Sequence, residues 1–320
     1  MGGAWFFPIF LAVLGLLPVT ESRASDAFGY IGNAARLPSG TTIVDARPEQ
    51  ACLRRTVRGA RCLPAADFLG PHGRLASFRE IYWLLGTAGL SEKAPVLVVG
   101  DDPSGRDFVA GMLYLCGQFR VSILTVPVSA GAGLSQDQMG QGIGRGMTRH
   151  PIYQGAVREN RIVLRGELAQ ELAAAHPPLV LDGRNEDEYW GERIRAMRGG
   201  HLPGAQSLPM VKVRAQIASG IVQIPPRGGL VAYGDSPFES VAYFTLLRAG
   251  AGADARVLPD GWSDWANHPG LPLDSVAYPD AFPAHVARLP DGRTDSDLLA
   301  FFAILAVLSA GFFYLGKRSR

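Results

Sequence analysis

Two stretches of the chain carry patterns of apolar and polar residues that predict strands and helices in turn. In the first stretch these elements are expected at residues 42–47, 78–85, 95–100, 108–117 and 121–126. The run at 95–100 is apolar throughout, which is typical of a strand buried on both faces. By contrast, 78–85 carries apolar residues at helical spacing, so we expect Tyr82 and Trp83 to point into a core.

The second stretch repeats the order strand, short helix, strand, helix, strand, at residues 178–184, 186–190, 230–233, 241–249 and 255–258. Strands that alternate with helices favour a parallel sheet covered on both faces. The predicted fold class is therefore α/β, with one domain over residues 25–130 and a second over residues 161–274. A chain of 320 residues is long enough for two such domains.

The segments outside the two domains differ from them in composition. Residues 131–160 are predicted to be a linker, and Gly, Ser and Gln enrichment over 129–146 favours a flexible surface connection. Residues 275–297, with several prolines, are predicted to be a tether.

The N-terminus resembles an export signal. An apolar run at 6–19 is followed by Ser-Arg-Ala at 22–24, small residues at the positions that a signal peptidase reads. We favour a signal peptide over residues 1–24, cleaved after Ala24. No Lys or Arg precedes the apolar run, so an uncleaved N-terminal anchor is the alternative.

The C-terminus predicts a membrane helix. Residues 298–315 contain no charged side chain and are long enough for a slightly short span. The tail at 316–320 is basic, which by the positive-inside rule places it in the cytoplasm. The body is then expected outside the cytoplasm, in the periplasm if the source is Gram-negative, which agrees with a signal peptide at the other end.

Charge and cysteine content narrow the function classes. The formal net charge is +2 without a basic stripe, so nucleic acid is not an expected partner. No Cys or His cluster has metal-ligand spacing, and no cofactor is predicted. Cys116 is expected to be a small core residue of a helix. Cys52 and Cys62 share one polar segment, and in an oxidising compartment they form either a disulfide or two unpaired thiols.

Four motifs occur in order in the second domain. They are Asp-Gly-Arg at 182–184, Gly-His-Leu-Pro-Gly-Ala at 200–205, an apolar strand leading through Gly234 into a helix, and Gly-Trp-Ser-Asp-Trp at 261–265. Together they resemble the rhodanese-like sulfurtransferases. The first domain resembles them in a more degenerate form, through Asp45-Ala-Arg47, the strand at 95–100 and Gly59-Ala-Arg-Cys-Leu-Pro64.

The resemblance implies two rhodanese-like domains, each a parallel sheet flanked by helices, in addition to the C-terminal transmembrane helix. In this family a cysteine at the end of the strand carries a sulfane sulfur. Gly234 stands at that position in the second domain and Gly100 in the first, so neither domain supplies a nucleophile there.

The loop that follows is the candidate ligand site, and it comprises Gly234, Asp235, Ser236, Pro237, Phe238, Glu239 and Ser240. In the family, backbone N–H groups of this loop point inward and hold an anion. Asp235 and Glu239 place acidic groups at the loop, which disfavours thiosulfate on Coulomb grounds.

The remaining motif residues have structural interpretations. Asp182 and Arg184 are expected to form an ion pair or to cap the following turn. His201 begins a tight turn and is expected to stabilise it by a hydrogen bond. Trp262, next to Gly261, is expected to pack beside the loop.

Three functions follow from these expectations. The first is an exported, membrane-tethered and catalytically inactive module that binds a protein partner near sulfur or redox chemistry. The second is a sulfurtransferase that works through a displaced cysteine or a partner's thiol. The third is a sensor of small anions that uses the loop without chemistry.

Overall fold

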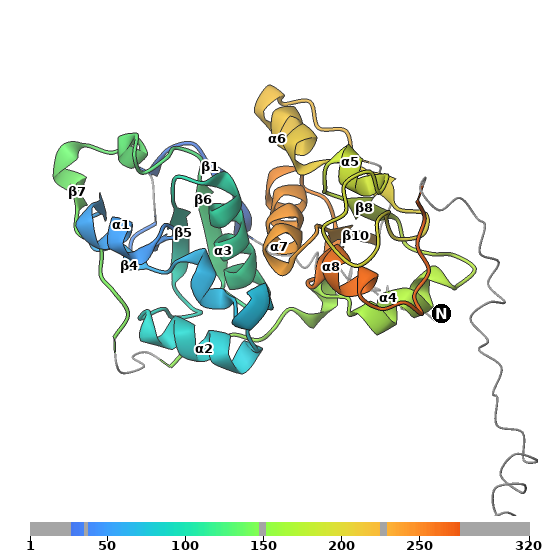
Figure 1. Cartoon of the computed structure of the whole chain (residues 1–320). Helices are drawn as coiled ribbons and strands as arrows, with labels where there is room; N and C mark the ends of the chain where they lie inside the picture. The colour runs from blue at the N-terminus through green and yellow to red at the C-terminus, as the bar shows by residue number, and fades with distance from the viewer. Residues whose placement is uncertain (1–26, 35–37, 147–151, 225–228, 276–320) are drawn as a thin grey trace, which may run out of the picture.

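The computed structural model describes residues 27–34, 38–146, 152–224 and 229–275 of the chain (Figure 1). The predicted signal peptide at 1–24, most of the tether, the predicted membrane helix at 298–315 and the tail at 316–320 lie outside these residues. Within them, no helix has the length and apolar character needed to cross a bilayer.

The first domain is built on a five-stranded parallel sheet. Its strands lie in the spatial order β1 (Ala27–Ile31), β6 (Arg120–Leu124), β5 (Pro95–Val99), β2 (Thr42–Asp45) and β4 (Arg61–Cys62). The apolar run at 95–100 forms the central strand, as its sequence predicts, and Val96 to Val99 are buried. The edge strand β1 was not expected from the sequence, and it pairs in register with β6.

The second domain has a four-stranded parallel sheet in the order β11 (Ala255–Val257), β10 (Leu230–Tyr233), β8 (Val180–Asp182) and β9 (Gln206–Ser207). All four residues of β10 are buried, so the strand that leads to Gly234 lies at the centre of the domain. The prediction of two domains with parallel sheets is confirmed.

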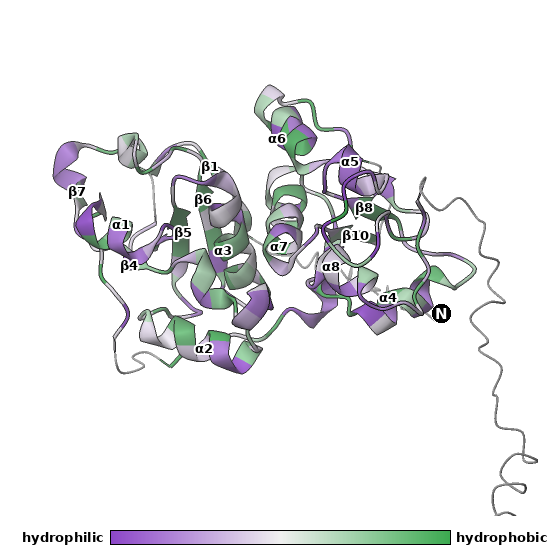
Figure 2. Ribbon diagram, viewed as in Figure 1, coloured by the Kyte–Doolittle hydropathy of each residue, from purple (hydrophilic) through white to green (hydrophobic). Residues whose placement is uncertain are grey.

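Helices flank both sheets (Figure 1). They are α1 (Glu49–Arg54), α2 (Phe78–Thr87) and α3 (Pro103–Leu115) in the first domain, and α4 (Arg165–Leu172), α5 (Glu186–Tyr189), α6 (Met210–Ser219), α7 (Pro237–Thr245) and α8 (Gly261–Ala266) in the second. Colouring by hydropathy shows apolar strands inside and mixed surfaces on the outer helices (Figure 2).

The two domains meet through α3 and α7, which lie side by side (Figure 1). The contact is close because α3 carries Gly111, where a Cβ would lie 2.3 Å from Thr245 Oγ1 and 2.6 Å from Val241 Cγ1. The rings of Phe108 and Phe238 pack with centroids 5.1 Å apart. The two domains therefore share one hydrophobic core across this helix pair.

An ion pair joins the same interface. Arg214 on α6 lies 2.6 Å from Asp107 on α3, and the Tyr30 hydroxyl donates to the same carboxylate at 2.6 Å. Asp107 is fully buried, and burial raises the pKa of its carboxyl to about 6, although Arg214 and the Tyr30 hydrogen bond act to lower it.

The prediction of a flexible connection over 129–146 is wrong. This segment folds back over the first domain, where β7 (Met139–Gly140) pairs antiparallel with β3 (Thr56–Val57). The Gly142 N–H donates to the Cys52 carbonyl at 3.1 Å, and Ala132 is completely buried. Its glycines serve close packing here, since a Cβ on Gly142 would lie 2.4 Å from Cys52 Sγ.

The cysteines occupy two separate environments. Cys52 on α1 and Cys62 on β4 form a disulfide, with their Cα atoms 5.7 Å apart. Cys116 caps the C-terminus of α3, is completely buried, and has a thiol pKa raised by that burial.

Candidate functional site

The loop after β10 is shorter than its sequence predicts. We expected the helix to begin at residue 241, but α7 begins at Pro237. Ser236 caps the helix by accepting a hydrogen bond from the Glu239 N–H at 3.3 Å, and Pro237 occupies the first turn, where no N–H is needed. Only residues 234–236 therefore remain as loop.

Side chains of α7 fill the space inside this loop. The Gly234 N–H donates to Ser240 Oγ at 3.0 Å, and the Asp235 N–H donates to Glu239 Oε2 at 3.1 Å. In the family the corresponding amides hold the anion. Here the chain supplies its own oxygen atoms to both amides, including a full negative charge from Glu239.

Gly234 has no room for a side chain. A Cβ at this position would lie 2.7 Å from Glu239 Cβ, 2.8 Å from the Glu239 carbonyl carbon and 2.9 Å from the Ser240 nitrogen. Two of these neighbours are backbone atoms, so a rotamer change cannot relieve the contact. The backbone of α7 thus leaves no space for a cysteine side chain at this position.

Gly261 locks the loop from the opposite side. Its φ of +63° is a left-handed conformation that favours glycine, and a Cβ there would lie 2.5 Å from the Gly234 carbonyl oxygen. This close approach lets the Trp262 N–H donate to the Gly234 carbonyl at 2.9 Å and the Ser263 N–H donate to the Asp235 carbonyl at 2.8 Å. The Gly-Trp motif therefore fixes the loop through α8.

Arg195 pairs with three acidic residues at the loop. Its guanidinium lies 3.0 Å from Glu239, 3.1 Å from Glu188 and 3.4 Å from Asp235. Burial alone would lower the pKa of Arg195, but Glu239 and the other two carboxylates hold it above its ordinary value. Burial raises the pKa of Asp235, and Arg195 opposes that rise.

Sequence reasoning missed Arg195, which lies 44 residues from Glu239. The surrounding run of residues 192–198 is rich in arginine, but the sequence does not say which arginine turns inward. Arg195 thus offsets one of the three negative charges beside the loop, and the Gly234 and Asp235 amides remain occupied.

Asp182 and Arg184 form a buried ion pair. The guanidinium holds both carboxylate oxygens, with Nη2 2.6 Å from Asp182 Oδ2, and also donates to the Gly200 carbonyl at 2.7 Å. It lies over the Trp262 ring at 4.6 Å. The pair therefore joins β8, the turn at 200–205 and α8, which supports its structural interpretation.

His201 is held inside the domain. Its ring stacks on Tyr189 with centroids 3.7 Å apart, and Nδ1 lies 2.9 Å from the Tyr189 carbonyl. Its backbone exchanges two hydrogen bonds with Asp274. His201 thus lies among residues that anchor the end of the domain.

The first domain has a related but different loop. Asp102 caps α3 by accepting from the Ser104 and Gly105 N–H groups, so this helix also begins earlier than expected, at Pro103. A Cβ on Gly100 would lie 2.9 Å from Cγ of the buried Arg106. The guanidinium of Arg106 is committed to the Leu124 and Thr125 carbonyls.

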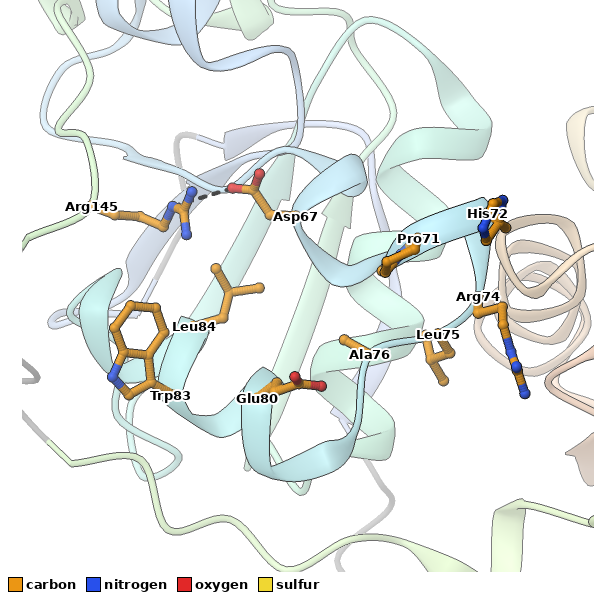
Figure 3. Close-up of a pocket in the computed structure, with 11 residues that line it drawn as sticks. Asp67, Pro71, His72, Arg74, Leu75, Ala76, Glu80, Trp83, Leu84 and Arg145 are labelled. Carbon is orange, nitrogen blue, oxygen red and sulfur yellow. Dashed lines mark ion pairs between the residues drawn. The ribbon is translucent and has the colours of Figure 1, made fainter.

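Two cavities lie against the first domain. One, of about 590 Å³, borders Gly100 and reaches Phe238 of the second domain. The other, of about 670 Å³, lies beside α2 and holds the Asp67–Arg145 ion pair (Figure 3). Phe238 is the one residue of 234–240 that borders either cavity.

Trp83 lines the cavity beside α2 and is 50% exposed, so the prediction that it lies in the core is wrong.

Comparison with known proteins gives the class of the chain. Residues 165–268 match the model of the rhodanese-like domain. A thiosulfate sulfurtransferase of Azotobacter vinelandii is 26% identical over 106 residues, which cover 30% of this chain and 39% of that protein. One from Pseudomonas aeruginosa is 26% identical over 119 residues, 34% of this chain and 44% of that protein. Each match thus spans less than half of the relative.

Solved structures resemble a larger part of the chain. A crystal structure of a probable thiosulfate sulfurtransferase is 25% identical and has a TM-score of 0.54. The match covers 75% of this chain and 99% of that protein. EanB shares the fold at a TM-score of 0.60 with 16% identity, over 76% of this chain and 65% of its own length. YnjE does so at a TM-score of 0.60 with 15% identity, over 76% of this chain and 64% of its own length. The chain is a tandem rhodanese-like domain protein related to thiosulfate sulfurtransferases.

Proposed function

We propose that this rhodanese-like protein is catalytically inactive and acts as an exported, membrane-tethered module that binds a protein partner. One observation carries the loss of activity: Glu239 and Ser240 occupy the Gly234 and Asp235 amides and also the space that a cysteine side chain needs. Without a thiol the loop has no sulfur carrier, and with the Gly234 and Asp235 amides occupied it offers fewer N–H groups to an anionic donor.

The three cysteines support the same conclusion. Cys52 and Cys62 are buried and consumed in a disulfide. Cys116 is completely buried at the end of α3, and a raised thiol pKa disfavours the thiolate that sulfur transfer requires. A displaced cysteine is thus a weaker explanation than loss of activity.

The anion-sensor alternative is disfavoured by the same filled loop. An incoming anion would have to displace the Glu239 carboxylate from the Asp235 N–H and from Arg195 at once. Export and tethering rest on the sequence of residues 1–24 and 298–320. They agree with the disulfide, since disulfides persist in oxidising compartments.

The test is a sulfur-transfer assay on the full chain in detergent, with thiosulfate as donor and cyanide or a thiol as acceptor. We expect no turnover above a denatured sample, and the Cys116→Ser variant should behave identically. Robust turnover by the wild type would overturn the proposal. A cross-linked pull-down from the native membrane then identifies the partner, and recovery of the chain alone would contradict the binding role.

A further inference from the structure

A loop beside the candidate site displays apolar side chains to solvent. Trp190, Ile194 and Met197 are 43%, 52% and 77% exposed, and we call these three residues the apolar loop face. They lie within one irregular segment between α5 and the turn at 200–205. Three large apolar side chains on one short loop are unusual for surface that meets only water.

Two arginines of the same loop turn toward the protein. Arg195 lies against the carboxylates of Glu188, Asp235 and Glu239. Arg198 donates to a set of main-chain carbonyls, those of Trp265, Ala266, His268 and Leu271. A typical surface loop turns charge outward and apolar groups inward; these two arginines depart from that order, whereas Glu192 and Arg193 of the same loop are exposed.

These inward contacts also make the loop rigid. Arg195 and Arg198 tie it to α5, α7 and the segment after α8, and Ala196 between them packs against the core of the second domain. The apolar loop face is consequently held in place in the free protein, so a surface that binds it meets preorganised side chains.

The described chain ends next to this face. The Ser275 hydroxyl donates to the Trp190 carbonyl at 3.5 Å, and Asp274 pairs through its backbone with His201. The uncharged run at 298–315 follows, and residues 276–297 can bridge at most roughly 75 Å. The tether therefore leaves the body at the apolar loop face and keeps it within reach of a bilayer.

We propose that the apolar loop face docks on the surface of the membrane that holds the C-terminal segment. Trp190 would lie at the headgroup level, where tryptophan is favoured, with Ile194 and Met197 in the adjoining acyl region. Arg193, whose side chain is 60% exposed, lies beside them and can meet lipid phosphates. Docking would set the orientation of the second domain on the bilayer. This inference rests on the membrane tether of the proposed function.

The cysteines of this chain make a direct test possible. Cys52 and Cys62 are bonded and Cys116 is buried, so an introduced cysteine is the accessible thiol for labelling. The full-length Met197→Cys variant, carrying an environment-sensitive fluorophore, is reconstituted into vesicles of phosphatidylethanolamine with a minor share of phosphatidylglycerol. The matched control is Phe119→Cys, because Phe119 is 62% exposed on the first domain.

We expect a blue-shifted emission at position 197 and at least a several-fold stronger quenching by lipid-borne nitroxides than at position 119. Adding Ile194→Glu should abolish most of that quenching, whereas adding Leu53→Glu on the first domain should leave it unchanged. Equal quenching at 197 and 119 in chains that float with the vesicles would overturn docking and leave the tether intact.

Two further outcomes count against the proposal. A blue shift at 197 without nitroxide quenching would indicate that a second copy of the chain covers the face, which overturns membrane docking. Failure of the full chain to float with vesicles would overturn the tether itself and the docking with it.

Discussion

The carboxylate of Glu239 accepts a hydrogen bond from the backbone N–H of Asp235 at 3.1 Å, and through this contact α7 occupies its own loop. In rhodanese-like enzymes the loop amides face a sulfur anion. In this protein the side chain of Glu239, four residues after Asp235, accepts from the Asp235 amide instead. Gly234 therefore lies in a loop that is contacted by side chains of the helix that follows it.

Restoring the cysteine alone should fail. Gly234→Cys is expected to lower the free energy of unfolding by about 1–3 kcal/mol, because the new Cβ meets the backbone of Glu239 and Ser240. The purified variant should show no sulfur transfer from thiosulfate. Chemical denaturation and the cyanide assay check both statements.

Its matched control is Gly166→Ala on α4, where a Cβ has nothing within 4 Å, and stability there should be unchanged or slightly raised. A Gly234→Cys variant as stable as the wild type would show that the loop opens readily.

Arg195 should be important for stability, whereas the nearby Arg193 should not. Arg195→Met leaves Glu188 and Asp235, both buried, without their closest cation, so we expect a loss of about 1–3 kcal/mol. Arg193→Met is the control, since Arg193 is exposed and 3.9 Å from Glu188, and its effect should stay within about 0.5 kcal/mol. Equal losses in urea denaturation would contradict the assigned role of Arg195.

The disulfide should stabilise the first domain. Replacing Cys52 and Cys62 together by alanine removes a cross-link across 10 residues, and the expected loss is about 2–3 kcal/mol. Dithiothreitol should lower the thermal midpoint of the wild type but leave that of the double variant unchanged. A wild-type midpoint that does not respond to the reductant would show that the bridge does not form in solution.

Asp107 should make stability fall as pH rises. Its folded pKa of about 6 lies above the ordinary value, so the folded state keeps a proton that the unfolded chain has already released. Between about pH 4 and 6, ionisation thus costs the folded state up to about 3 kcal/mol relative to the unfolded chain, and the cost is constant above that range.

The Asp107→Asn variant isolates this effect. The unfolding free energy of the wild type minus that of the variant should decrease across pH 4 to 6 and then level off. A difference that grows with pH would mean that the ion pair with Arg214 outweighs the burial of the carboxyl.

Much of the fold follows from the sequence because buried parallel strands have a strong signature. The apolar runs at 95–100 and 230–233 identify the central strands β5 and β10 closely. β1 was missed, since its partly exposed Ala-Phe-Gly-Tyr-Ile is stabilised by pairing with β6. Likewise, the Gly-rich composition of 129–146 conceals a segment that is fixed by long-range hydrogen bonds and by its fit to the disulfide.

The candidate site was predictable only in part. The sequence predicts that Gly234 stands at the position of the family's cysteine, with Glu239 close to it. It does not reveal that Glu239 folds back onto Asp235 or that Arg195 lies across all three carboxylates. Those relations depend on helix capping by Ser236 and on tertiary contacts, which residue spacing does not encode.

Gly111 has a consequence for the chain as a whole. Because α3 and α7 approach closely enough to exclude a single methyl group, each domain provides part of the covering layer of the other. A fragment that contained one domain would expose aromatic rings such as Phe108 to water and would be prone to aggregate. The smallest part of this chain that covers its own core is thus the pair of domains, and a larger side chain at Gly111 would force the two domains apart.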